Sequence, residues 1–156
     1  MTGAFRLRDP RQFLALGFGS GLAPRAPGTA GTLAALPLVW GLSLLPLGLY
    51  LLAVGLAFLL GCWVCGATAR AVGVHDHPAI VWDEFVGLAV TLIAVPSTPV
   101  ALVLGVVLFR VFDILKPWPI RWLDRHVHGG LGIMLDDVIA AIPAAAILHG
   151  VLSVLD

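Results

Sequence analysis

The sequence predicts an all-α integral membrane protein, a helical bundle of four to five short helices with an N-terminal arm. Three observations support this fold class. Hydrophobic residues make up 60% of the 156 residues and charged residues only 12%, whereas a soluble domain is typically about 45–50% apolar and about 25% charged. The mean hydropathy is +1.02. The apolar residues form runs separated by turns rich in proline and glycine, and helices satisfy the backbone of a chain that crosses lipid.

The net charge of the chain helps to decide which kind of partner to expect. Nine Lys and Arg residues balance nine Asp and Glu residues, so net charge gives no reason to expect nucleic acid as a partner. We expect membrane lipid instead. Residues 1–156 are expected to form a single domain, in which residues 1–28 form the N-terminal arm and a loop rich in glycine and proline.

Turn residues divide the chain into five apolar segments. The predicted helices cover residues 33–45, 49–67, 80–95, 100–115 and 131–155. Several of these ranges are short for a hydrocarbon core of about 30 Å, because a helix rises about 1.5 Å per residue. The first is the weakest candidate for a span, so it either crosses the bilayer or re-enters on the same side.

Every cation falls on one side of this hairpin scheme. The cations precede the first helix, lie between the second and third, or lie at or after the end of the fourth: Arg6, Arg8, Arg11, Arg25, Arg70, Arg110, Lys116, Arg121 and Arg125. The turns at 46–48 and 96–99 carry none. By the positive-inside rule, the charged side of this multi-pass protein faces the cytoplasm.

Five carboxylates are predicted to meet at one depth. Asp83 and Glu84 begin the third helix, Asp113 ends the fourth, and Asp136 and Asp137 lie about one turn inside the fifth, which starts from the same side. Ionised carboxylates do not crowd together without a cation, because like charges raise one another's pKa. Hard oxygen ligands suit Mg²⁺, so the pattern predicts one or two such ions.

The basic residues near these acids allow two interpretations. Either Arg70, Arg110 and Lys116 neutralise the acids in structural ion pairs, or they bind an anionic substrate. Arg110 and Asp113 stand three apart on one helix face, so that pair is plausible in its own right. Lys116 follows Asp113 by three residues and is expected to face the site. The tryptophans and arginines that follow Lys116 are explained by anchoring in the headgroup layer.

Two further stretches carry candidate residues. Residues 23–32, APRAPGTAGT, lead directly into the first helix, where free backbone amides, with Thr29 and Thr32 as hydroxyl donors, make a candidate phosphate site that Arg25 closes. The alternative is that this stretch is only a connector. In the loop GVHDHPAIVWDE, His75 is a candidate general acid for an alkoxide leaving group, and the alternative for this loop is a solvated histidine.

Four segments, in this order, carry a resemblance to a known family: PGTAGTLAALP, HDHPAIVWDEFVG, LFRVFDILKPWPIRWLD and HGGLGIMLDDVIAA. Over residues 27–141 the chain resembles the bacterial phosphatidylglycerophosphatase A family. The resemblance implies a Mg²⁺-dependent hydrolase of the inner (cytoplasmic) membrane. Such an enzyme removes the terminal phosphate of phosphatidylglycerophosphate, giving phosphatidylglycerol and phosphate in phospholipid biosynthesis.

The resemblance and the reasoning above together give the expected site. The resemblance implies the five acids, Lys116 and the glycine–threonine stretch, whereas His75 and the three arginines are inferred from the residues themselves. The expected catalytic residues are Asp83, Glu84, Asp113, Asp136, Asp137, Lys116 and His75. The expected metal ligands are Asp83, Glu84, Asp113 and Asp137. The expected substrate-binding residues are Arg25, Gly28, Thr29, Thr32, Arg70 and Arg110.

Two mechanisms and one other function class stay open at this point. The nucleophile is either a metal-activated hydroxide or one of the acids, through an aspartyl-phosphate intermediate. A small ion-coupled membrane transporter or proton-relay subunit also uses intramembrane carboxylates, but it places them near the midplane and often shows repeated halves. Here the acids gather toward one edge beside cations, which favours a phosphate-bearing lipid.

Overall fold

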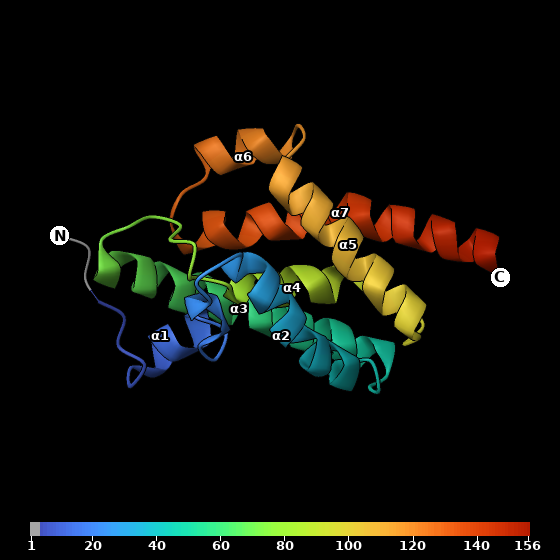
Figure 1. Ribbon diagram of the computed structural model, residues 1–156, viewed down its shortest axis with the longest axis horizontal. Coiled ribbons are helices and arrows are strands. Elements are labelled where there is room, and N and C mark those ends of the chain that lie inside the picture. The colour runs from blue at the N-terminus through green and yellow to red at the C-terminus, as the bar shows by residue number, and fades with distance from the viewer. Residues whose placement is uncertain (1–3) are drawn as a thin grey trace.

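The computed structural model describes residues 4–156, which form seven α-helices, one short 3₁₀ helix and no strand (Figure 1). The helices are α1 (Pro10–Ala15), η1 (Ser20–Leu22), α2 (Pro27–Leu42), α3 (Leu47–Val72), α4 (Trp82–Thr91), α5 (Pro99–Leu115), α6 (Ile120–His126) and α7 (Gly129–Leu155). The all-α prediction is confirmed, but the predicted count of four to five helices is wrong for the described residues. The prediction relied on long apolar runs, and α1 and α6 are short helices that carry arginines.

The five predicted apolar helices correspond to α2, α3, α4, α5 and α7. Helix α3 ends at Val72 rather than at residue 67, and α4 ends at Thr91 rather than at residue 95. The most informative shift is at the start of α2. Helix α2 starts at Pro27 rather than at residue 33, because Ala26 takes a left-handed conformation (φ 47°) and Pro27 occupies the first helical turn. The glycine–threonine stretch therefore lies inside the first turns of α2 and not in a loop. Proline also begins α5, where the Thr98 hydroxyl caps the helix by accepting a hydrogen bond from Ala101 N at 3.2 Å.

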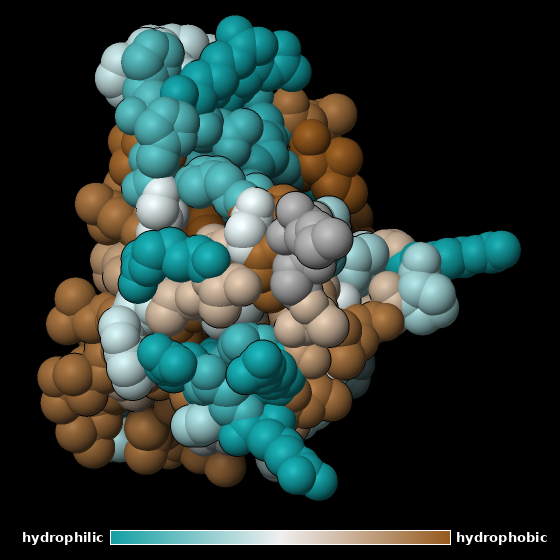
Figure 2. Space-filling model, turned by 90° about the vertical axis from the view of Figure 1, so that its left-hand side faces the viewer, coloured by the Kyte–Doolittle hydropathy of each residue, from teal (hydrophilic) through white to brown (hydrophobic). Residues whose placement is uncertain are grey.

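The helices pair as the hairpin scheme expects. The α2–α3 turn and the α4–α5 turn lie at one end of the molecule (Figure 1), where the hydroxyl groups of Ser43 and Ser97 are 2.8 Å apart. The N-terminal arm, the α3–α4 loop and α6 lie at the other end. Seen from that end, hydrophilic side chains gather above and below the centre and apolar side chains form the flanks (Figure 2).

Glycines bring the helices into close contact around α4, of whose ten residues nine are buried. A Cβ on Gly130 of α7 would lie 1.8 Å from the carbonyl oxygen of Cys62 in α3. A Cβ on Gly87 of α4 would lie 2.4 Å from the Phe109 ring and 3.1 Å from the Cβ of Asp137. The absence of side chains at these two positions lets α7 approach α3 and α4 directly.

Two helices, α3 and α7, are long and apolar enough to cross a membrane. The most apolar window of each has a mean hydropathy of 2.2, yet only 22% of that window is buried inside the protein. The core helix of a soluble protein would be mostly buried, whereas here Leu59 of α3 is 65% exposed and Ile142 of α7 is 56% exposed. These exposed apolar faces indicate association with a membrane.

Candidate active site

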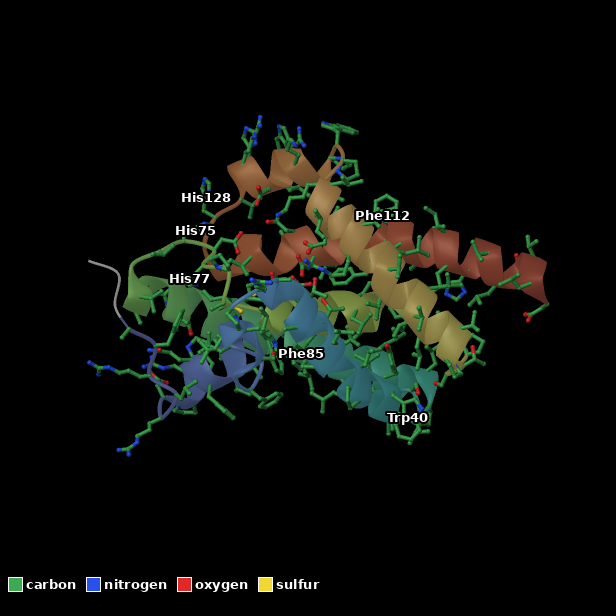
Figure 3. All side chains as sticks on the ribbon, viewed as in Figure 1. Trp40, His75, His77, Phe85, Phe112 and His128 are labelled. Carbon is green, nitrogen blue, oxygen red and sulfur yellow. The ribbon has the colours of Figure 1, made fainter. Side chains whose placement is uncertain are left out.

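Three helices bring the five predicted carboxylates to one place. Asp83 and Glu84 lie in the first turn of α4, Asp113 in the last turn of α5, and Asp136 and Asp137 near the start of α7. All five residues are buried, with exposed fractions between 3% and 8%. In Figure 3, side-chain oxygens gather where α5 crosses α7.

These carboxylates line a cavity of about 300 Å³, which we call the acidic cavity. Its charged side chains are Asp76, Asp83, Glu84, Asp113, Asp136, Asp137 and Lys116. His77 and Gly28 also contribute to its wall. The acidic cavity thus combines six carboxylates with a single lysine, an excess of negative charge that requires protons or a bound cation.

One group of three carboxylates lies at the junction of α4 and α7. Single oxygens of Asp83, Glu84 and Asp137 all lie within 4.8 Å of one another. Asp83 Oδ1 accepts a hydrogen bond from the backbone N–H of Glu84 at 3.0 Å. Thr32 donates to Glu84 Oε2 at 3.1 Å. Asp137 Oδ2 is buried and has no hydrogen-bond partner among the described residues.

A second group consists of Asp76, Asp124 and Asp136, which again offer oxygens within 4.8 Å of one another. Lys116 Nζ lies 3.5 Å from Asp124 Oδ1 and 3.7 Å from Asp136 Oδ2. Burial lowers the pKa of Lys116, but the carboxylates of Asp136 and Asp124 outweigh this and hold that pKa above its ordinary value. A hydrogen bond from Asp136, assisted by the charge of Lys116, lowers the pKa of Asp124. Lys116 is therefore a cation held between acids.

The donor set of the first group fits a hard divalent cation. Carboxylate oxygens are the ligands that Mg²⁺ and similar ions prefer. The unpartnered oxygen of Asp137 lies in that group, and Asp136 Oδ1 in the neighbouring group is likewise buried without a hydrogen-bond partner within residues 4–156. Buried oxygens without partners cost free energy unless a proton or a cation satisfies them. The two groups can accordingly hold a metal ion.

Arg110 pairs with the acids. Its Nη1 lies 2.9 Å from Glu84 Oε1 and 3.0 Å from Glu84 Oε2, and it also forms an ion pair with Asp113. The Arg110 side chain is only 16% exposed. A Cβ on Gly28 would lie 2.9 Å from Glu84 Oε1 and 3.0 Å from Arg110 Nη2, so the glycine leaves room for this pair.

Six predicted residues do not line the acidic cavity, although two of them, Thr32 and Arg110, contact Glu84 from outside it. Arg25 and Arg70 are exposed, and neither they nor Thr29 form its wall. Thr29 lies in the first turn of α2, because the helix begins earlier than predicted. His75 Nε2 accepts a hydrogen bond from Gly129 N at 3.0 Å, and His75 lies beside His128 at the start of α7 (Figure 3). His75 thereby caps the start of α7 and is not part of the wall of the acidic cavity.

The sequence model of the family described as Phosphatidylglycerophosphatase A matches residues 13–152 of this chain. The chain belongs to the phosphatidylglycerophosphatase A family. Within this family, the Escherichia coli (strain K12) protein named Phosphatidylglycerophosphatase A is 50% identical over 145 residues, which cover 92% of this chain and 84% of that protein. The protein of the same name from Haemophilus influenzae is 50% identical over 147 residues, covering 93% and 90%. No solved structure matches the chain.

Membership in the phosphatidylglycerophosphatase A family confirms the resemblance found in the sequence and makes the chain a phosphatase, a phosphoric monoester hydrolase. Asp76 and Asp124 belong to the second group of acids, although neither is among the expected site residues. Asp124 follows Lys116 by eight residues in a segment rich in arginine and tryptophan, which we explained by anchoring alone. The available signal was that Asp76 and Asp124 each stand in a segment that carries the family resemblance, HDHPAIVWDEFVG and LFRVFDILKPWPIRWLD. Only the fold of α6 over the start of α7 reveals Asp136 as the neighbour of Asp124.

Proposed function

We propose that this chain hydrolyses the terminal phosphomonoester of phosphatidylglycerophosphate, giving phosphatidylglycerol and phosphate, with Mg²⁺ as its cofactor. The observation that carries the proposal is the acidic cavity, in which six carboxylates and Lys116 line one space. Two relatives that are 50% identical over nine tenths of the chain bear the name of this activity. A phosphorylated lipid headgroup also suits a cavity that lies near the hydrophilic end of an apolar bundle.

Asp83, Glu84 and Asp137 are the residues that would hold the metal ion, with Asp113 beside them as the remaining predicted ligand. When bound, Mg²⁺ would neutralise charge on the phosphoryl oxygens and favour ionisation of the attacking water. Arg110 keeps Glu84 and Asp113 in place, because its guanidinium group contacts both carboxylates. In this proposal Arg110 positions ligands and does not bind the substrate.

Lys116 and Asp136 act on the substrate itself. The ammonium group of Lys116 offsets the negative charge of the transferred phosphoryl group, the main source of catalysis in phosphoryl transfer. The water oxygen bonds to phosphorus as the ester P–O bond breaks. Asp136, whose Oδ1 has no hydrogen-bond partner in the described part of the chain and whose carboxyl lies beside Asp124, gives a proton to the leaving glycerol oxygen. The proton released by water restores Asp136, so the reaction balances.

The protein crosses the membrane several times, with the hydrophilic end in the cytoplasm. The arm before α2, the end of α3 and helix α6 all carry arginines and lie at that end (Figure 1). The two turns at the opposite end contain no lysine or arginine. Cationic loops are retained on the cytoplasmic side, which supports this orientation. Phosphatidylglycerophosphate would then enter with its headgroup at the cytoplasmic surface.

The test is phosphate release from phosphatidylglycerophosphate by the purified full-length chain in detergent micelles. We expect release with Mg²⁺ and none after chelation with EDTA. Asp136→Asn should lose on the order of 10²–10⁴ in kcat, the usual contribution of a positioned acid or base. Asp156→Asn, the same chemical change at an exposed residue, is the matched control and should retain full activity. Release that EDTA leaves untouched would refute the metal-dependent reaction.

A further inference from the structure

A second cavity, of about 340 Å³, lies beside α6. We call it the basic cavity. Its polar and aromatic lining consists of Lys116, Trp118, Arg121, Trp122, Arg125 and His126. None of the residues that line it is acidic. Anchoring in the headgroup layer explains why such residues occur at a helix end, but it does not explain why they enclose a space.

The arginines of the basic cavity are available to bind an anion. Arg121 and Arg125 stand four apart on α6 and therefore share one face of the helix. Within residues 4–156, neither forms an ion pair, and the one hydrogen bond made by either side chain runs from Arg121 Nη2 to the carbonyl oxygen of Leu115 at 3.5 Å. The planar guanidinium group matches phosphate oxygens in a bidentate geometry.

The aromatic side chains place this cavity at the level of lipid headgroups. Trp122 stacks on His126 with ring centroids 4.4 Å apart, and His126 Nδ1 lies 2.7 Å from the carbonyl oxygen of Trp122. Trp118 is 81% exposed at the rim. Exposed tryptophans beside arginines are typical of the interface between hydrocarbon and water.

Three cavities adjoin one another through shared residues. Lys116 lines both the acidic cavity and the basic cavity. Pro117 and Trp118 line both the basic cavity and a third, apolar cavity of about 590 Å³. The apolar cavity lies between α5 and α7, with Phe112 and Ile142 on its wall. From the first cavity to the third, the lining therefore changes from acidic to basic to apolar.

The order of the three cavities matches the order of the chemical groups along the proposed substrate. Phosphatidylglycerophosphate carries a terminal phosphomonoester, then a glycerol bridge, then a phosphodiester, then two acyl chains. A phosphomonoester suits a metal ion and Lys116 in the acidic cavity. A phosphodiester has one negative charge and suits arginines, whereas an acyl chain suits apolar walls.

We propose that the basic cavity binds the phosphodiester of the phospholipid substrate through Arg121 and Arg125, with an acyl chain in the adjoining apolar cavity. The inference rests on the proposed function, since it assigns the second phosphate of the same lipid. It makes the two arginines determinants of specificity. They select lipids in which a phosphodiester stands at a fixed spacing from the phosphate to be removed.

The two reaction products probe the two polar cavities separately. Inorganic phosphate reports on the acidic cavity, and a short-chain phosphatidylglycerol reports on the basic cavity. We would measure KM, kcat and the inhibition constants of both products for Arg121→Gln/Arg125→Gln in neutral detergent micelles. Arg8→Gln, an exposed arginine of the N-terminal arm, is the matched control.

We expect KM and the inhibition constant of phosphatidylglycerol to rise on the order of 10- to 100-fold, the effect of losing one or two charge-assisted hydrogen bonds. The kcat value and the inhibition constant of phosphate should stay close to those of the wild type. Arg121→Lys/Arg125→Lys keeps the charge and loses the bidentate geometry. Its KM should therefore lie between that of the wild type and that of Arg121→Gln/Arg125→Gln. This second variant also guards against a simple folding defect.

Three outcomes would overturn the inference: an unchanged KM, equal rises in both inhibition constants, or a defect seen only on anionic vesicles. The last would mean that the arginines bind bulk lipid rather than substrate. If the wild type released no phosphate at all, the proposed function would fail first. Tryptophan fluorescence on titration with the same phosphatidylglycerol would still decide whether the arginines bind a phosphodiester.

Discussion

Arg110 is the residue at which a structural role and a substrate-binding role predict different measurements. Its guanidinium group lies 2.9 Å from Glu84 Oε1 and also pairs with Asp113, with 16% of the side chain exposed. At an effective dielectric constant of about 20, one unit charge pair at this distance is worth about 6 kcal/mol before desolvation. Removing one partner of a buried pair typically costs about 3–5 kcal/mol, because the other charge stays buried and unpaired. We therefore expect Arg110→Gln to lose about 3–5 kcal/mol of unfolding free energy.

Unfolding of the purified chain in mixed detergent micelles, without metal or substrate, measures this loss. Arg110→Gln/Asp113→Asn restores the net charge of the group formed with Glu84. It should recover part of the loss, with a coupling energy of about 1–3 kcal/mol between the two sites. An Arg110→Gln variant that unfolds like the wild type but has a raised KM would refute this reasoning. Arg110 would then bind the substrate, as the sequence analysis expected.

Two glycine substitutions test the packing around the site. Gly28→Ala would place its Cβ 2.9 Å from Glu84 Oε1. We expect kcat to fall about tenfold, because that carboxylate must move, while circular dichroism stays unchanged; full activity would contradict a role for Glu84 in metal binding. Gly130→Ala would place its Cβ 1.8 Å from the backbone carbonyl oxygen of Cys62. We expect the separation of α3 and α7 to cost about 1–3 kcal/mol in thermal unfolding experiments, and an unchanged midpoint would contradict the close helix contact.

Much of the fold could be predicted because apolar runs and proline turns mark helices directly. The range predicted for the fourth helix, 100–115, differs from α5 by one residue at its start. The start of α2 was missed by six residues, because we interpreted the glycines and prolines of 23–32 as a loop. In the structure the chain turns at a single residue in the left-handed conformation, Ala26, and Pro27 then begins the helix. Helices α1 and α6 were missed because six- and seven-residue helices leave almost no periodic signal.

The meeting of the five acids could be predicted because it depends only on hairpin geometry. Residues equally far from a tight turn on two paired helices lie at the same depth, which brings Glu84 and Asp113 to one level. Their shared partner Arg110 shows that they also face each other. The second group of acids could not be predicted in this way. Asp76 and Asp124 lie in the α3–α4 loop and on α6, and no helical period fixes the position of either relative to Asp136. The pairing of Arg110 was one of two stated alternatives, and only the distances to Glu84 favour it.

The depth of the acids along α7 separates the hydrolase from the transporter alternative. Asp136 lies seven residues after Gly129, or about 10 Å from the start of a helix that is about 40 Å long. An ion-coupled transporter holds its acids near the midplane, whereas here the second half of α7 carries no acidic residue. Beyond the acids, the same helix contributes Ile139, Ile142 and Pro143 to the apolar cavity. Along α7 the cavity lining thus changes from charged to apolar with increasing distance from the hydrophilic end. A phospholipid has the same polarity when its headgroup lies at that end and its acyl chains enter the bilayer.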